Sequence, residues 1–285
     1  MWFTSKALVH LIILFLCGNA WADASSAAHN LFVNMSLARL SYGKSVTEHT
    51  TEARPTLIKG IYVIRMKSNK EFISYTNEAG TISGGSDGLK VFSASGNRPL
   101  TSEELRNLRT EVMRNISYAN LVKVPYGNGG GRKILLFSAV DCPYCKIFEA
   151  SMKKYEGAIN TTFYVVPSAL RAIELGGLKP GLKAIDIWCA VNSTKAWKKY
   201  WVNQSSPKKT KCHSEKMVRS MAKLGYYLKD FLAATGTKIH GYPGFVDEAG
   251  SILSVNVTKL NSKNVKQLFG EKNKPRDSPH KRSWL

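Results

Sequence analysis

The chain has 285 residues, of which 41 are Lys or Arg and 20 are Asp or Glu, so its formal net charge is +21. Its length is sufficient for one sizeable core and a smaller module. The charge is strongly basic, but no nucleic-acid-binding motif accompanies it, so we expect no nucleic-acid partner.

The N-terminus has the three parts of a secretory signal peptide. Lys6 precedes an apolar stretch over 7–17, and Ala20-Trp21-Ala22 is a small-x-small cleavage site. We expect cleavage after Ala22, which leaves 263 residues and no later segment able to cross a bilayer. The mature protein is therefore predicted to be exported and soluble.

The next segments favour a small β-rich N-terminal domain over 23–100. A short amphipathic helical pattern covers 30–40, with apolar Leu31, Val33, Leu37 and Leu40, and the stretch 50–56 is polar. The segments 58–65, 70–76 and 81–83 are rich in β-branched and aromatic residues and are separated by turn residues. They predict antiparallel strands.

A helical linker is predicted over 101–128. It opens with the capping box formed by Thr101 and Glu104, and it ends before Pro125 and the glycines at 127–131.

The region 129–270 alternates strand and helix. The predicted order is strand 133–139, helix 142–155, strand 162–166, helical stretches over 168–204, helix 215–234, a hairpin from 244 to 255 and a helix over 261–269. This order fits a thioredoxin fold with a helical insertion, so the fold class is α+β. The tail over 271–285 is basic and too poor in apolar residues to pack, which predicts a mobile tail.

The sequence Cys142-Pro143-Tyr144-Cys145 stands between the strand and the helix. At the first turn of a helix, unsatisfied N–H groups and the helix dipole favour a thiolate, which is the nucleophile of disulfide exchange. Cys142 is therefore predicted to attack, and Cys145, one turn on, to resolve the mixed disulfide. A structural disulfide or half a zinc site is the alternative interpretation.

Cleavage removes Cys17 and leaves four cysteines, for which three pairings are conceivable. The close spacing of Cys142 and Cys145 favours these two as the redox pair, and then Cys189 and Cys212 form a structural bridge. A four-cysteine zinc site would normally use two short knuckles, and the chain has one, so no metal and no cofactor are expected.

Basic residues are concentrated between Lys195 and Lys223, where nine of them accompany a single acid, Glu215. They could form a solvated helical face or contact an anionic lipid, a cell-wall polymer or an acidic protein.

Four segments make the chain resemble the bacterial periplasmic disulfide isomerases of the DsbC/DsbG family: residues 55–64, 133–146, 187–197 and 240–245. The Cys-Pro-Tyr-Cys sequence resembles the DsbG branch, whereas Cys189 and Cys212 resemble the second disulfide of the DsbC branch.

The resemblance implies a periplasmic homodimer joined by its N-terminal domains, which acts on unfolded or misoxidised exported proteins and is kept reduced by an inner-membrane donor of the DsbD type. It also implies that Pro243 is a cis-proline beside the active site. Family members commonly have Thr before this proline, whereas this chain has Tyr242.

His240 precedes Pro243 by three residues and is a candidate modulator of the Cys142 thiolate. Together these features predict a thiol–disulfide oxidoreductase, either an isomerase or a reductase. The alternatives are a reductase of sulfenic acids on single cysteines and a chaperone-like module that binds unfolded proteins.

Overall fold

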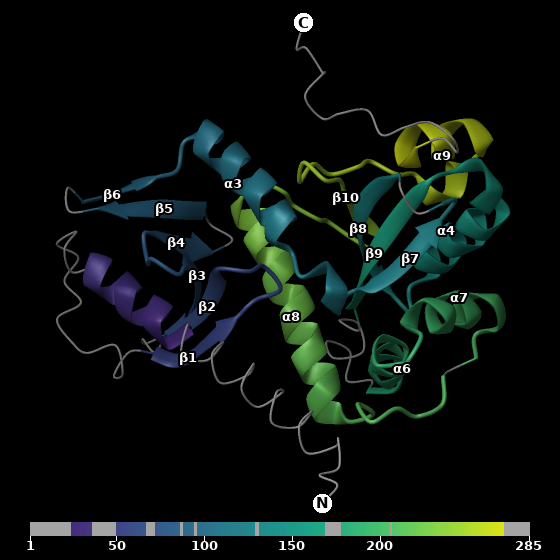
Figure 1. Ribbon diagram of the computed structural model, residues 1–285, viewed down its shortest axis with the longest axis horizontal. Helices are drawn as coiled ribbons and strands as arrows, with labels where there is room; N and C mark the ends of the chain where they lie inside the picture. Colours follow the sequence, from purple (N-terminus) through teal and green to yellow (C-terminus); the bar gives the residue numbers. More distant parts are fainter. Residues whose placement is uncertain are drawn as a thin grey trace, which may run out of the picture. The chain divides into compact units, whose positions relative to one another are not determined.

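The computed structural model describes residues 24–35, 50–66, 72–85, 88–93, 96–128, 131–168, 178–205 and 207–270 (Figure 1). The predicted signal peptide over 1–22 and the predicted tail over 271–285 lie outside these residues. The described chain forms two compact units. One contains the residues up to Ile116 together with Tyr227–Gly236, and the other contains Ser117–Tyr226 and the residues from Thr237 onward. No helix within the described ranges is long and apolar enough to span a membrane.

The first unit contains a six-stranded antiparallel sheet in which the strands follow sequence order. The strands are β1 (Thr50–Pro55), β2 (Ile61–Met66), β3 (Phe72–Asn77), β4 (Ile82–Gly85), β5 (Gly88–Ser93) and β6 (Gly96–Pro99). The predicted strands at 58–65, 70–76 and 81–83 are confirmed as β2, β3 and β4. The polar segment at 50–56 is the edge strand β1, because an edge strand needs one pairing partner and tolerates Pro55.

A helix over 24–35 begins six residues earlier than the predicted helical pattern at 30–40. Leu31 belongs to its buried face, as predicted, whereas Val33 is 43% exposed. The remaining buried positions of this helix are occupied by Ala24, Ala27, Ala28, Phe32 and Met35. The helix contacts the turn after β3, where Asn30 Nδ2 donates to Glu78 O at 3.0 Å and Asn34 Nδ2 donates to Ala79 O at 2.9 Å.

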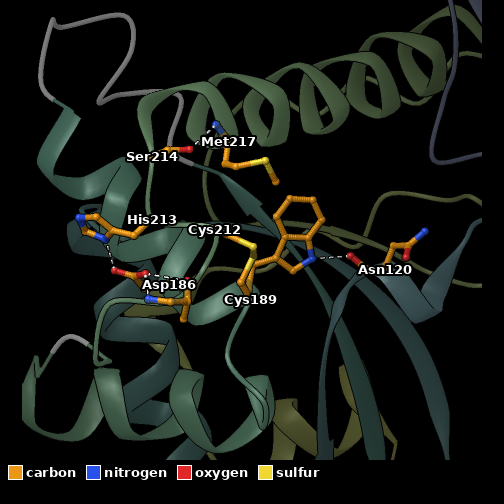
Figure 2. The surroundings of a disulfide bond; sticks show 9 residues. Asn120, Asp186, Cys189, Cys212, His213, Ser214 and Met217 are labelled. Carbon is orange, nitrogen blue, oxygen red and sulfur yellow. Dashed lines mark hydrogen bonds and ion pairs between the residues drawn. A yellow bond between two sulfur atoms is a disulfide. The ribbon is translucent and has the colours of Figure 1, made fainter. Parts of the chain in front are cut away.

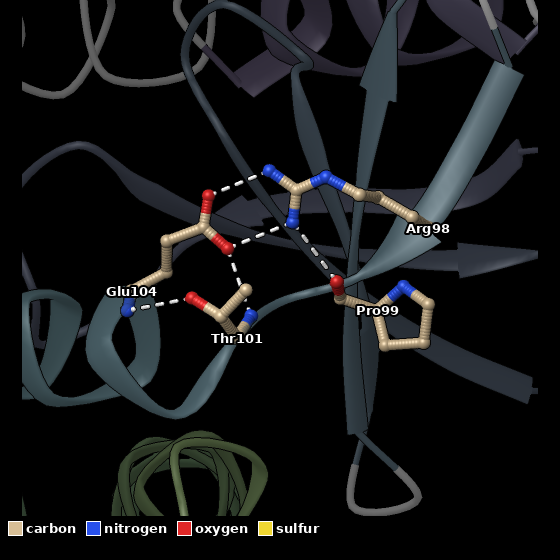
Figure 3. Close-up of polar contacts among 4 residues, drawn as sticks. All are labelled: Arg98, Pro99, Thr101 and Glu104. Atoms are coloured by element: carbon tan, nitrogen blue, oxygen red, sulfur yellow. Dashed lines mark hydrogen bonds and ion pairs between the residues drawn. The ribbon is translucent and has the colours of Figure 1, made fainter.

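Helix α3 (Ser102–Asn115) starts with the predicted capping box (Figure 3). The Glu104 amide donates to Thr101 Oγ1 at 3.2 Å, and the Thr101 amide donates to Glu104 Oε2 at 2.8 Å. Arg98, on β6, donates to both carboxylate oxygens of Glu104 at 2.7 and 2.8 Å. Hydrogen bonding to Arg98 and to the Thr101 amide lowers the pKa of Glu104 to about 2, so this cap stays charged through the neutral range.

We predict that Thr101→Ala lowers the free energy of unfolding by about 1 kcal/mol, because the Glu104 amide loses its acceptor. Ser102→Ala, at the neighbouring exposed position, is the control and is expected to change stability by less than about 0.5 kcal/mol. Urea unfolding of both variants measures the difference, and equal stabilities would contradict the capping role.

The predicted helical linker over 101–128 is helical only as far as Asn115, apart from a short 3-10 turn at Tyr118–Asn120. Residues Val122–Tyr126 form strand β7 instead, in which Val122 and Val124 are buried and Lys123 is exposed. This alternation has the period of a strand, and Pro125 is tolerated because β7 lies at a sheet edge.

The second unit contains a four-stranded sheet in the order β10-β8-β9-β7. Strands β8 (Arg132–Ala139) and β9 (Thr161–Ser168) are parallel and are joined through helix α4 (Pro143–Lys154), whereas β7 and β10 (Gly244–Val246) run antiparallel to their neighbours. Between β9 and β10 the described residues form helices α6 (Leu178–Trp188), α7 (Ser193–Asn203) and α8 (Glu215–Ala234). Helix α9 (Ser262–Phe269) follows, so the predicted α+β class is confirmed, and the described elements from β8 to α9 follow the predicted order apart from the second strand of the hairpin.

The predicted hairpin from 244 to 255 is formed only in part. Its second strand is reduced to a bridge between Val246 and Ile252, although Leu253 N still donates to Phe245 O at 3.0 Å. Ile252 is 45% exposed, so little burial favours a longer strand there.

Four aromatic rings pack helices α4 and α9 against the sheet of this unit. Phe148 of α4 lies 4.8 Å from Phe245 of β10 and 5.5 Å from Phe163 of β9, measured between ring centroids. Phe269 of α9 lies 5.2 Å from Phe163, and Figure 1 shows α4 and α9 beside one another. All four rings are at least 98% buried, so this cluster fixes the position of α4 relative to β10.

Candidate active site at the start of helix α4

Cys142 is the N-cap residue of α4, and Pro143 occupies the first helical position. The Cys145 amide donates to Cys142 Sγ at 3.4 Å, so the sulfur accepts one of the hydrogen bonds that the helix start leaves unmatched. The side chain is half-buried, and its thiol is free. The sulfur thus lies at the N-terminus of the helix, where it accepts a backbone hydrogen bond and is partly accessible to solvent.

Cys145 has a different environment one turn later. Its side chain is fully buried, and burial raises the pKa of its thiol well above the ordinary value. The nearby Ser138 side chain and Ala139 backbone offset this rise only in part. Cys145 therefore stays a thiol in the neutral range. Cys142 is the more accessible of the two sulfurs.

The segment before β10 lies against Cys142. The Tyr242–Pro243 peptide bond is cis, and the Cys142 thiol donates to the Tyr242 carbonyl oxygen at 3.5 Å. Cys142 and Tyr242 are 100 positions apart in the sequence, and they come into contact because β10, which follows Tyr242, pairs with β8, which precedes Cys142. Both Tyr242 and Pro243 are half-buried.

Helix α7 supports the turn that leads into Cys142. The Tyr200 hydroxyl donates to the Val140 carbonyl oxygen at 2.9 Å, and Trp197 Nε1 donates to Glu149 Oε1 of α4 at 3.0 Å. Trp197 and Tyr200 belong to the core, because both are at least 97% buried. The helical insertion therefore fixes both ends of the first turns of α4.

Glycine at position 244 allows the segment after Pro243 to pack closely. A Cβ added there would lie 2.4 Å from Ile239 Cγ2 and 3.1 Å from the Gly241 carbonyl oxygen, whereas a Cβ at Gly241 would meet no atom within 4 Å. We predict that Gly244→Ala costs about 1–3 kcal/mol of stability and slows thiol exchange, because Tyr242 and Pro243 must shift.

The matched control for that substitution is Gly241→Ala, which is expected to change neither property. Thermal unfolding and reduction of a small aromatic disulfide measure the two effects. Equal behaviour of the two variants would show that the close packing at Gly244 does not position the site.

Glu149 is a carboxyl group buried between α4 and α7. Burial raises the pKa of Glu149 to about 8, although the hydrogen bond from Trp197 and the charge of Lys198 act in the opposite direction. Between about pH 4.5 and 8 the folded protein therefore holds a proton that the unfolded chain releases.

We predict that this group contributes stability which is fully present below about pH 4.5 and is lost as the pH rises to about 8. In Glu149→Gln, the decrease of the free energy of unfolding with pH should be smaller by up to about 1 kcal/mol per pH unit within this window. Urea unfolding of both proteins across the window tests this, and parallel stability profiles would contradict it.

Cys189 and Cys212 form a disulfide at the end of α6 (Figure 2). Trp188 Nε1, beside it, donates to the Asn120 carbonyl oxygen at 2.6 Å. On its other side the buried Asp186 accepts from the Thr210 amide at 2.8 Å and lies 2.6 Å from His213 Nδ1. The bridge and the Asp186 carboxylate together connect α6 to the segment before α8.

The structure brings together Cys142, Cys145, Tyr242 and Pro243. The predicted modulator His240 is exposed, and no contact between it and Cys142 is found among the described residues, so its role stays a prediction. Pro143 and Tyr144 are exposed beside Cys142, and Tyr144 is 57% exposed.

Sequence reasoning missed Ser138, Glu149 and Gly244, which surround or support the site. Glu149 had a signal, because it falls on the buried stripe of α4 together with Cys145 and Phe148. In the described part of the chain no cluster of three or more His, Cys, Asp or Glu side chains could hold a metal ion.

No protein-family model matches the sequence, and no curated protein matches it. Among solved structures, the chain is similar to a disulfide interchange protein from Neisseria gonorrhoeae, with 21% identity over 54% of this chain and 99% of that chain, at a TM-score of 0.37. It is also similar to DsbG from Helicobacter pylori, with 12% identity over 70% and 93% of the two chains, at a TM-score of 0.36. A third similar structure is MdbA, a thiol-disulfide oxidoreductase from Actinomyces oris, with 13% identity over 56% and 89%, at a TM-score of 0.29.

Proposed function

We propose that this protein is a thiol–disulfide oxidoreductase that uses Cys142 as the attacking sulfur and Cys145 as the resolving sulfur. The observation that carries the proposal is the asymmetry of the two thiols. Cys142 is half-buried at the N-terminus of α4 and accepts an amide hydrogen bond, whereas Cys145 is fully buried. A substrate sulfur can reach the first and not the second.

The reaction starts with the Cys142 thiolate. It attacks one sulfur of a substrate disulfide, so that a bond forms between Cys142 Sγ and that sulfur while the substrate bond breaks. The second substrate sulfur leaves as a thiolate with the electron pair and takes up a proton. The Tyr242 carbonyl oxygen lies 3.5 Å from Cys142 Sγ, where an extended substrate segment would pass.

The mixed disulfide has two routes onward. In reduction, Cys145 loses its proton, which the departing substrate thiolate can accept, and attacks Cys142 Sγ. The products are an enzyme disulfide and a substrate reduced by two electrons. In isomerisation, another thiol of the substrate attacks instead, and Cys142 leaves as the thiolate. Because burial raises the pKa of Cys145, less of it is thiolate than for an exposed thiol, which slows the first route and favours the second.

Isomerisation needs the reduced form of the redox pair. We therefore include in the proposal a dithiol donor of the DsbD class, a homodimeric state, a periplasmic location and substrates that are misoxidised exported proteins. These features rest on the resemblance to the DsbC/DsbG family and on the export signal in the sequence.

We predict that Cys145→Ala accumulates mixed disulfides with a substrate protein that carries non-native disulfides. The adduct on Cys142 persists because Cys145 can no longer attack it and release the substrate. Non-reducing electrophoresis followed by mass mapping should locate each adduct on Cys142. Cys142→Ser should abolish exchange altogether.

The double variant Cys142→Ser/Cys145→Ala is the matched control, and it should form no adducts. Adducts that persist in it would show that the nucleophile is another cysteine. If that variant also restores scrambled substrate to the native form as well as the wild type does, thiol chemistry is not the function of this protein.

A further inference from the structure

A groove runs along the outer face of α7, away from the residues of that helix that support the active site. It has a volume of about 660 Å³ and is lined by Asn192, Thr194, Lys195, Lys198, Lys199 and Val202. The inward positions Trp197 and Tyr200 are buried, whereas Lys195, Lys199 and Val202 follow one another at helical spacing on the opposite side.

The groove is positively charged, and its centre is held in place. Lys198 Nζ pairs with Glu156 Oε1 at 2.7 Å and lies 4.7 Å from the centre of the Tyr126 ring. Lys195 and Lys199 have no carboxylate within ion-pair distance anywhere in the described ranges. The lining therefore holds two lysines without a protein counter-charge, Lys195 and Lys199, beside Lys198, which is paired with Glu156.

The spacing of the two unpaired lysines matches an extended polypeptide. Lys195 and Lys199 are four residues apart on a helix, which separates them by about 6 Å along its axis. In an extended chain, alternate side chains point to the same side at intervals of about 6.6 Å. Two carboxylates with one residue between them can therefore face the two ammonium groups together.

From this groove we propose that α7 is a docking surface for an extended acidic segment of a partner protein, with Asp or Glu at alternate positions. An apolar side chain next to these carboxylates contacts Val202, which is 59% exposed. This binding function is separate from thiol exchange and does not depend on Cys142.

Two other occupants fit less well. A second copy of this chain carries a net charge of +21, so its approach to a basic groove is repelled. An anionic membrane surface would attract the same lysines, but stable membrane anchoring needs an additional apolar contact, and Val202 is the apolar residue of this lining.

The test uses the full mature chain and three fluorescein-labelled peptides: a Glu-Thr repeat, a Gln-Thr repeat, and a Glu-Glu-Thr-Thr repeat, which has the composition of the first but no two Glu residues two positions apart. By fluorescence anisotropy at low salt, we expect the Glu-Thr repeat to bind most tightly, with an affinity that falls as salt is raised to about 0.5 M. Lys195→Glu/Lys199→Glu should lower this affinity about tenfold or more.

The matched control is Lys259→Glu/Lys263→Glu, which changes the net charge equally at two exposed positions that are also four residues apart. It should alter the affinity by less than about twofold. The milder Lys195→Gln/Lys199→Gln variant should give an intermediate loss, and all three variants should keep the thiol-exchange rate and circular dichroism spectrum of the wild type.

Three results would overturn the inference. Equal losses in the groove and control variants would mean that only net charge matters. Equal binding of the Glu-Thr and Glu-Glu-Thr-Thr repeats would contradict recognition of carboxylates at alternate positions of an extended chain. Binding to phosphatidylglycerol vesicles that requires Lys195 and Lys199, without binding of the Glu-Thr peptide, would assign the surface to membranes.

Discussion

The contact between Phe148 and Phe245 is the constraint on which the rest of the candidate site depends. Phe148 lies two turns into α4, and Phe245 follows the Tyr242–Pro243 segment by two residues, so the 4.8 Å between their rings sets the distance between the two halves of the site. Phe163 of β9 and Phe269 of α9 pack against each other in the same cluster. Because protein cores are close-packed, α4 cannot slide along the sheet without opening a cavity, and the Cys142 sulfur stays beside the Tyr242 carbonyl oxygen.

That fixed position produces the chemical difference between two cysteines only three residues apart. At the N-cap, Cys142 meets backbone N–H groups and solvent, whereas one turn further Cys145 enters the apolar space above β8. Burial raises the pKa of the inner thiol, whereas the outer sulfur is half-buried. In the proposed exchange reaction, this difference in depth sets the order in which the two sulfurs act.

Much of this arrangement could be predicted from the sequence because it is encoded locally. The capping box at Thr101 and Glu104, the helix from Cys142 and the helix over 215–234 depend on residues within one or two turns, and the structure contains all three. Strand β7 and the short second half of the terminal hairpin could not be recognised in the same way. The first contains Pro125, which is tolerated only because no strand pairs beyond it, and the second is exposed at Ile252.

The missed residues of the site have a common cause, which is that their role arises from tertiary contacts that no local pattern shows. Glu149 lies beside Trp197, 48 residues later, and Gly244 is required by the close approach of Ile239, five residues earlier. A sequence pattern shows that Glu149 lies on the buried face of α4 but not that a tryptophan from the insertion donates to it. Similarly, the glycine after Pro243 gives no sign that a methyl group would collide with its neighbour.

Helix α7 connects the two surfaces inferred for this protein and also keeps them apart. Its inward residues Trp197 and Tyr200 hold α4 and the turn before Cys142, and its outward residues Lys195 and Lys199 line the basic groove. The helical period of 3.6 residues places these two sets on opposite sides, so charge can change on one side without repacking the other. The inward face of α7 can therefore hold the candidate redox site in place, while the side chains on its outward face are free to contact the proposed acidic segment.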